Sequence, residues 1–275
     1  MINRTTYSQI ISQQREWALQ RNIPFDDKGY VTDLEANLFL PLCKDTESDF
    51  SKGRGDELGI AGGHGKMKAL HSSSALAVNF FEYWRQNSQF HFIAQACGFK
   101  GNATGMRFEA THDTPIGSTP HLDLEFTSND NQVLAVESKF TETYRYHTRR
   151  KIKDMYLKPG VWKGLPGCER LAQQILLDQK AKTSFTFLDA PQLLKHILAL
   201  ANECGDNFEL LYLWYYIPSL EGEEHKKEIT DFKNRIDDRV RFRDMTYQEL
   251  FNVIEKNISL NPDYRIYIKE RYFTE

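Results

Sequence analysis

The chain lacks the features that mark several common classes of protein. Its four cysteines are widely spaced and form no Cys-x-x-Cys pair, which argues against a zinc ribbon and against a disulfide framework. No run approaches 18 apolar residues, and the N-terminus does not pair a charged segment with an apolar one. We therefore expect a cytoplasmic protein with reduced thiols and no membrane partner.

An excess of charge of one sign is also lacking. The 35 Lys and Arg residues are balanced by 38 Asp and Glu, for a net charge of −3, which argues against a protein that coats nucleic acid nonspecifically. The sequence has no internal repeat, low-complexity tract or clear interdomain linker. At 275 residues it is long enough to bury a large core. We expect N-terminal helices and a Gly-rich loop over residues 1–70, packed on a domain over residues 71–275 as one structural unit.

Glycines are concentrated over residues 44–66, which are predicted to form a mobile loop. Residues 61–66 superficially resemble a phosphate-binding loop. The required spacing fails, however, because Ile60 occupies the first glycine position and Met67 replaces the final Ser or Thr. The sequence therefore does not predict an NTPase.

The most informative residues lie on two predicted strands joined by a polar turn. The first strand, over 119–127, alternates apolar and polar residues, as a half-buried strand does. The second, over 132–140, contains a continuous apolar run, which is typical of a strand covered on both faces. Asp123 lies on the first strand. Glu137 and Lys139 end the second, and because side chains alternate they point to the same side.

Pairing of these strands would bring Asp123 and Glu137 close enough to share Mg²⁺ or Mn²⁺, cations that prefer oxygen ligands. Such a metal polarises a phosphoryl oxygen and lowers the pKa of bound water. Lys139 could position that water or neutralise developing charge. The Glu-x-Lys tripeptide alone carries little weight, since residues 224–226 repeat it. Only the copy at 137–139 follows an apolar strand with an Asp-bearing strand upstream.

This arrangement resembles the PD-(D/E)XK nuclease superfamily, whose motif is an Asp at the start of one core strand and a Glu-x-Lys on the next. Asp123 matches the motif Asp, Glu137 the acidic metal ligand and Lys139 the lysine. Leu122 stands where the motif has Pro. The resemblance implies that Asp123, Glu137 and Lys139 are catalytic, with the first two holding the metal.

A closer resemblance is to a group of bacterial restriction endonucleases, over roughly residues 70–272. It implies an α/β fold with a restriction-endonuclease-like core: a central mixed β-sheet flanked by helices, with helical N- and C-terminal additions. It also implies metal-dependent hydrolysis of nucleic acid, most simply by a DNA endonuclease of restriction type. The segments that carry it are 137–142, Val161-Trp162 with Cys168, 193–196 and 211–215.

The same resemblance implies further site residues. The carbonyl of Ser138 is a candidate metal ligand. A third carboxylate would come from Glu82, on a predicted helix before the first strand, or from its rival Glu109. Gln173 and Gln174 lie on the first helix after the lysine strand, where family members often carry a polar residue that faces the site.

A basic segment with interleaved aromatic residues begins shortly after Lys139. Basic residues neutralise phosphates and aromatic rings stack on bases, so the segment is a candidate nucleic-acid surface, although a solvated helix would show the same pattern. Its predicted binding residues are Arg145, Arg149, Arg150, Lys151 and Lys153, among Tyr144, Tyr146, Tyr156 and Trp162.

The remaining pattern predicts helices at about 72–86, 168–182, 189–203 and 223–238 and a last strand at 208–217. This order predicts a parallel strand added by a helical crossover. Two other functions stay open: a non-catalytic nucleic-acid-binding or interaction protein on the same fold, and a hydrolase of small phosphoesters. A homodimer would suit cleavage of both DNA strands. The sequence does not distinguish DNA from RNA.

Overall fold

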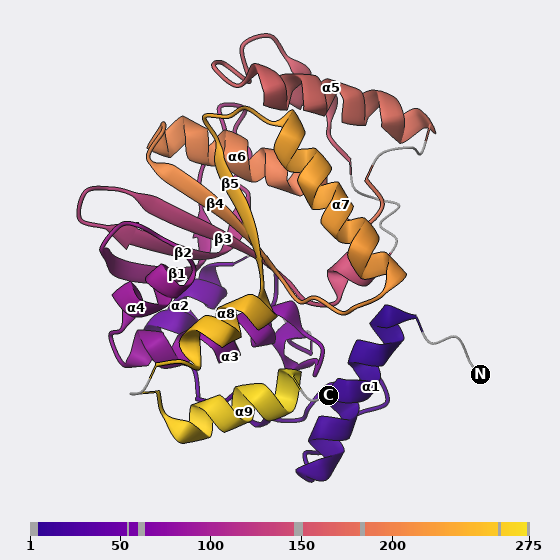
Figure 1. Cartoon of the computed structure of the whole chain (residues 1–275), viewed down its shortest axis with the longest axis vertical. Coiled ribbons are helices and arrows are strands. Elements are labelled where there is room, and N and C mark those ends of the chain that lie inside the picture. Colours follow the sequence, from indigo (N-terminus) through magenta and orange to yellow (C-terminus); the bar gives the residue numbers. More distant parts are fainter. Residues whose placement is uncertain are drawn as a thin grey trace.

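The computed structural model describes residues 5–53, 55–59, 64–145, 151–181, 185–257 and 260–273. These residues form a five-stranded sheet with helices on both faces (Figure 1). The strands are β1 (Ala103–Thr111), β2 (His121–Ser128), β3 (Val133–Lys139), β4 (Phe208–Trp214) and β5 (Arg241–Thr246). The predicted α/β fold with a central mixed sheet is confirmed.

The order of strands in the sheet follows the chain, from β1 to β5. β1, β2 and β3 pair antiparallel, whereas β3, β4 and β5 pair parallel. Parallel neighbours need a crossover connection. Between β3 and β4 it contains α5 (Pro166–Ala181) and α6 (Ala190–Cys204), and between β4 and β5 it contains α7 (Leu220–Arg235). The predicted helical crossover is therefore confirmed.

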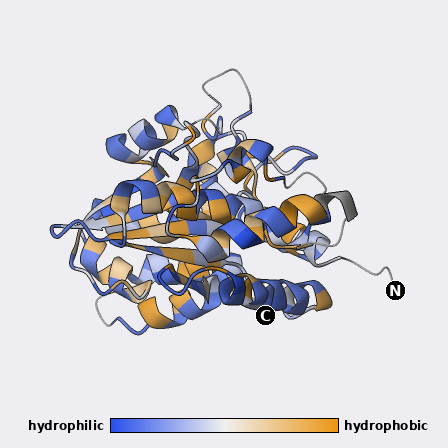
Figure 2. Cartoon of the chain, turned by 90° about the horizontal axis from the view of Figure 1, so that it is seen from above, coloured by the Kyte–Doolittle hydropathy of each residue, from blue (hydrophilic) through white to orange (hydrophobic). Residues whose placement is uncertain are grey.

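Each face of the sheet is covered by its own set of helices. α5, α6 and α7 close one apolar layer, and Figure 1 shows α5 outside α6 and α7. The other layer is closed by α1 (Thr6–Gln20), α2 (Lys44–Lys52), α3 (Ser73–Gln86), α4 (Phe90–Ala96), α8 (Tyr247–Ile254) and α9 (Pro262–Tyr272). In Figure 2 the strands are largely hydrophobic, and hydrophilic residues line the outer turns of the helices. None of the described helices is long and apolar enough to cross a membrane.

Local sequence signals explain several of these elements. Residues 133–138 of β3 are buried, as expected for a strand covered on both faces. The Ser72 side chain accepts a hydrogen bond from the backbone N–H of Ala75 and caps α3. Thr246 and Glu249 form a reciprocal capping box that begins α8. The structure thus confirms the strand predicted over 132–140 and the helix predicted from about residue 72.

The prediction of a loop over all of 44–66 is wrong for its first part. Lys44–Lys52 is helix α2, with acidic side chains in its first turn and a lysine in its last, which suits the helix dipole. Its Phe50 stacks on Phe108 of β1, and its Asp49 accepts a hydrogen bond from the backbone of Phe108. The polar composition of this segment concealed a helix that covers the edge of β1.

The sequence also failed to indicate β5. Arg241, Arg243 and Asp244 leave little apolar alternation, and Phe242 is the one buried side chain of the strand. β5 forms at the sheet margin because β4 offers it a parallel partner. A strand stabilised mainly by its backbone pairing leaves a weak sequence pattern.

The N-terminal helix is joined to the C-terminal one through a buried cation. Arg271 of α9 is fully buried and donates to the side chain of Gln14 and to the backbone oxygen of Asn37. Its guanidinium lies over the ring of Trp17. These contacts pack N-terminal residues on the rest of the fold. The division at residue 70 stays a prediction.

A buried histidine ties the start of the sheet to α6. His112, just after β1, contacts Glu125 of β2 through Nε2, and its Nδ1 lies 2.7 Å from Oε2 of Glu203 on α6. Burial alone would lower the pKa of His112. Hydrogen bonds with Cys204, Glu125 and Glu203 and the charge of Glu125 outweigh burial and raise this pKa to about 10. The His112 imidazolium is therefore part of the fold at neutral pH.

We expect His112→Asn to destabilise the protein by about 2 kcal/mol near pH 6 and by much less near pH 10. The folded pKa lies above the ordinary value of 6.5, so the contribution is complete below pH 6.5 and is lost as the pH rises through about 10. The difference in Tm between variant and wild type across this range tests it. A difference independent of pH would contradict the assignment.

Candidate active site

Three carboxylates occupy successive positions across the first three strands of the sheet. Phe108 and Ala110 pair with Leu124 and Leu122, so the intervening Glu109 is aligned with Asp123. Leu124 pairs with Val136, which aligns Asp123 with Glu137 just beyond the last regular pair of β2 and β3.

Two cationic or hydrogen-bonding side chains contact the carboxylate of Glu137. Lys139 donates to Oε1, and Nε2 of His196, on α6, lies 3.0 Å from Oε2. Burial alone would raise the pKa of Glu137, but the charge of Lys139 and the imidazole of His196 outweigh burial and lower it well below its usual range. Glu137 is therefore an anion although its side chain is only 1% exposed.

Asp123 has the opposite electrostatic environment. Its Oδ2 accepts a hydrogen bond of 2.7 Å from the backbone N–H of Ser138. Burial, and then the negative charge of Glu137, raise the pKa of Asp123 well above its usual range, against the opposing charge of Lys139. Two carboxyl groups with pKa values driven apart are typical of functional sites.

Glu109 is the third of the aligned carboxyl groups, and its charge, like that of Glu137, raises the pKa of Asp123. Burial and the charges of Glu57 and Glu137 raise the pKa of Glu109 to about 7. Its Oε2 lies 3.4 Å from Nδ1 of His121. Its backbone φ of 49° is in the left-handed region, which is costly for a residue other than glycine. Strained backbone of this kind is concentrated at active sites.

Glu82, the alternative third carboxylate, is occupied elsewhere. Its oxygens accept hydrogen bonds from the backbone of Cys43, the hydroxyl of Thr46 and the amide of Gln86. It therefore supports the start of α2. Of the two candidates for a third ligand, the structure brings Glu109 to the Asp123–Glu137 pair.

The segment that precedes α3 adds charged groups that the sequence did not indicate. Glu57 accepts a hydrogen bond from Ser74, and its Oε1 lies 3.9 Å from Nζ of Lys66. The charges of Glu57 and Lys66 both act on the pKa of Glu109. Part of the Gly-rich segment therefore borders the site, which no motif in the sequence predicted.

The donor set fits a hard divalent cation, since Asp123, Glu137 and Glu109 all provide carboxylate oxygens. Among the described residues, no group of three or more His, Cys, Asp or Glu side chains is arranged as a ready-made metal cage. Mg²⁺ is usually held by one or two carboxylates, with water and substrate phosphate completing its shell. The arrangement suits that mode.

The basic segment is only partly as expected. Arg145, Lys151 and Lys153 are exposed, while Arg149, Arg150 and Tyr146 lie outside the described residues. The prediction that its aromatic residues stack on bases is wrong for three of the four. They are buried and hydrogen-bonded within the protein, because they complete the core: Tyr144, Tyr156 and Trp162.

Gln173 and Gln174 are exposed on α5. That helix packs on α6 and α7, so the helix that reaches the site is α6, through His196. Contact of either glutamine with substrate stays a prediction. His196 belongs to a segment that carried the family resemblance, but its contact with Glu137 was missed. The signal that could have revealed it is a histidine within the apolar face of a helix.

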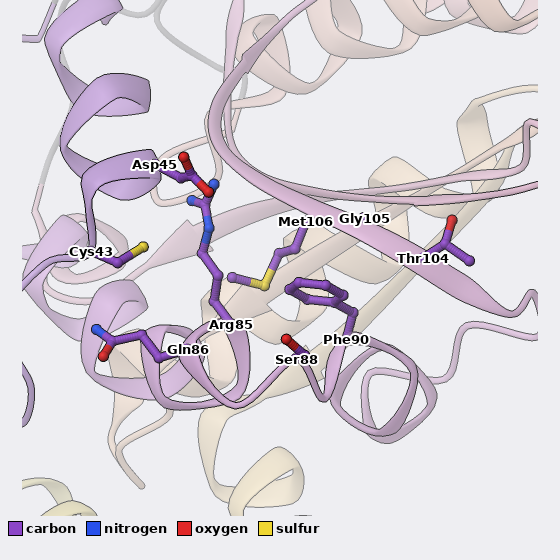
Figure 3. Close-up of a pocket in the computed structure, with 9 residues that line it drawn as sticks. All are labelled: Cys43, Asp45, Arg85, Gln86, Ser88, Phe90, Thr104, Gly105 and Met106. Carbon is purple, nitrogen blue, oxygen red and sulfur yellow. The ribbon is translucent and has the colours of Figure 1, made fainter.

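A pocket of about 540 Å³ lies at the other end of β1. Figure 3 shows its lining, with Met106 between Arg85 and Phe90. Arg85 is paired there with Asp49. The lining contains no predicted site residue, so this pocket is separate from the aligned carboxylates.

The model of a family described as "Restriction Endonuclease associating with ARP" matches residues 11–273, which include all five strands and the aligned carboxylates. No curated protein and no solved structure matches the chain.

Burial of Asp123 and its repulsion by Glu137 predict that Asp123→Asn stabilises the metal-free protein at pH 7 by ~1 kcal/mol, or about 2 °C in Tm. The folded pKa lies above the ordinary value of 3.8, so the aspartate costs stability as the pH rises above 3.8. The gain should therefore vanish near pH 3. Melting curves in a chelator test it, with the exposed Asp238→Asn as control. Destabilisation at pH 7 would refute the repulsion.

Proposed function

The chain belongs to the family described as restriction endonuclease associating with ARP, and we propose that it is a metal-dependent nuclease of the PD-(D/E)XK type that cleaves DNA. The observation that carries the proposal is the alignment of Asp123 with Glu137 at adjoining strand ends, with the ammonium of Lys139 on Glu137. A charged lysine beside a buried glutamate and a partly buried aspartate is costly in a purely structural role. It suits the hydrolysis of an anionic phosphodiester.

Asp123 and Glu137 would hold Mg²⁺ or Mn²⁺, with Glu109 as third carboxylate and the carbonyl of Ser138 as a further candidate ligand. When bound, the metal supplies Lewis-acid polarisation of the phosphate and a lowered pKa for water. The backbone N–H of Ser138 fixes the position of Asp123. Binding requires Asp123 to lose its proton, so metal affinity should rise with pH.

Lys139 acts as a charged donor. Burial alone would lower its pKa, but the charges of Glu137, Asp123 and Glu142 raise it above its usual range. A protonated lysine orients the attacking water or neutralises charge that develops on the phosphate. It does not have to serve as the general base.

DNA is the proposed substrate because exposed basic residues follow the site in the chain. Arg145, Lys151 and Lys153 can neutralise backbone phosphates while the protein as a whole stays slightly acidic. The description of the family names a restriction endonuclease, which favours DNA over RNA as the substrate.

The decisive experiment is cleavage of supercoiled plasmid, linear duplex, single-stranded DNA and RNA with Mg²⁺ or Mn²⁺. We expect Asp123→Ala and Lys139→Ala each to reduce DNA cleavage by at least about 100-fold. The matched control is Lys226→Ala, which removes the exposed lysine of the second Glu-x-Lys tripeptide on α7. It should cleave like wild type.

The outcomes separate the alternatives. Absence of both cleavage and Mn²⁺ binding in well-folded wild type would overturn the catalytic assignment and leave a non-catalytic binding protein. Hydrolysis of a chromogenic phosphodiester without cleavage of nucleic acid would favour a small-molecule hydrolase. Cutting of RNA alone would overturn DNA as the substrate.

The two third-carboxylate candidates make a second test. We expect Glu109→Gln to weaken Mn²⁺ binding about 10-fold, whereas Glu82→Gln should keep the affinity and lower stability by about 1–3 kcal/mol, because it disrupts one buried and two part-buried hydrogen bonds. Calorimetric titration with Mn²⁺ and melting curves measure both effects. The reverse pattern would assign the third position to Glu82.

A further inference from the structure

His196 has an unusual position for a polar side chain. It lies on the face of α6 that packs on the sheet, is 1% exposed, and is surrounded in the chain by the buried residues Leu193, Leu194, Ile197 and Leu200. Glu203, two turns further along α6, faces the same way and contacts His112. The helix is therefore held to the sheet by a polar contact at each of these two positions.

Stability alone does not explain an imidazole at this depth. Among the residues that the structure describes, neither ring nitrogen of His196 meets hydrogen-bond geometry with a partner, and neither does Oε2 of Glu137. The one ion-pair contact of the ring is the approach of Nε2 to within 3.0 Å of that oxygen. An unsatisfied buried nitrogen costs about 1–3 kcal/mol. Leucine or methionine would fill the same space without that cost. The contact with Glu137 is what distinguishes histidine from an apolar residue here.

The contact restricts how the Glu137 carboxylate is oriented. Lys139 contacts Oε1 and His196 lies 3.0 Å from Oε2, so each oxygen has its own neighbour. A carboxylate oxygen has two lone pairs, and each oxygen therefore keeps one for a cation. Lys139 has a flexible stem and can turn toward an incoming phosphate. The imidazole sits on a packed helix and can stay in place.

We propose that His196 is a positioning residue, which holds the Glu137 carboxylate in the orientation that binds the divalent cation. This inference rests on the function proposed above. It gives α6 a role in the site beyond its packing. Outer residues that orient metal ligands typically affect metal affinity about 10- to 100-fold.

The test compares His196→Leu, which fills the space without a donor, with His196→Gln, which restores an N–H donor. The matched control is His225→Leu, at another fully buried histidine on α7 that contacts Tyr212. Mn²⁺ dissociation constants are measured without nucleic acid by calorimetry or electron paramagnetic resonance, beside melting curves. Should His196→Leu fail to fold, His196→Met replaces it as a more adaptable side chain without a donor.

We expect His196→Leu to raise the Mn²⁺ dissociation constant about 10- to 100-fold, and His196→Gln to recover most of that loss. His225→Leu should change it less than about 2-fold, even where it lowers Tm. In cleavage assays the His196→Leu defect should shrink as Mn²⁺ approaches saturation. A merely structural histidine would lower Tm without this selective effect on metal.

The contrary results are distinguishable. Wild type that binds Mn²⁺ through Asp123, together with an unchanged constant in His196→Leu, would overturn the positioning role and leave the proposed nuclease intact. Equal losses in His196→Leu and His196→Gln would overturn it too, since the donor would not matter. Wild type that binds no Mn²⁺ would overturn both proposals.

Discussion

The neutralisation of one buried anion underlies the arrangement of the candidate site. Glu137 sits at the end of β3, beneath the helices of one layer, where an isolated carboxylate would be very unfavourable. Lys139, on the same strand, compensates the negative charge of Glu137, and so does His196, on a helix that follows much later in the chain. Burial disfavours the ionisation of Asp123, and the neighbouring carboxylate of Glu137, which is already ionised, disfavours it further.

The docking of α6 links this electrostatic arrangement to the fold. The helix closes an apolar layer of the sheet and makes two polar contacts. His196 contacts Glu137 of β3, and Glu203 contacts His112. The second contact extends through His112 to Glu125 of β2. The strands that carry Asp123 and Glu137 are thus both fastened to one helix. A displacement of α6 would therefore displace β2 and β3 together.

Much of this organisation could be predicted from local patterns. The alternation on β2, the apolar run of β3 and the capping residues of α3 and α8 all act over a few positions, and the structure agrees with each. β5 could not be predicted, because its charged residues hide a strand that depends on pairing with β4. The meeting of His196 with Glu137 is a tertiary contact, and no local pattern encodes it. The alignment of Glu109 with Asp123 likewise required the register of β1 and β2.

The left-handed backbone of Glu109 also bears on protein engineering. Glycine or asparagine would adopt that conformation more easily than glutamate, so a redesign guided only by foldability would replace it. A preference for a conformationally unfavourable residue is a sign of selection for something other than stability. Variant libraries sorted for expression alone would therefore drift away from glutamate at this position. Libraries sorted for the activity proposed above should retain glutamate, and the contrast between the two selections would mark this position as part of a functional site.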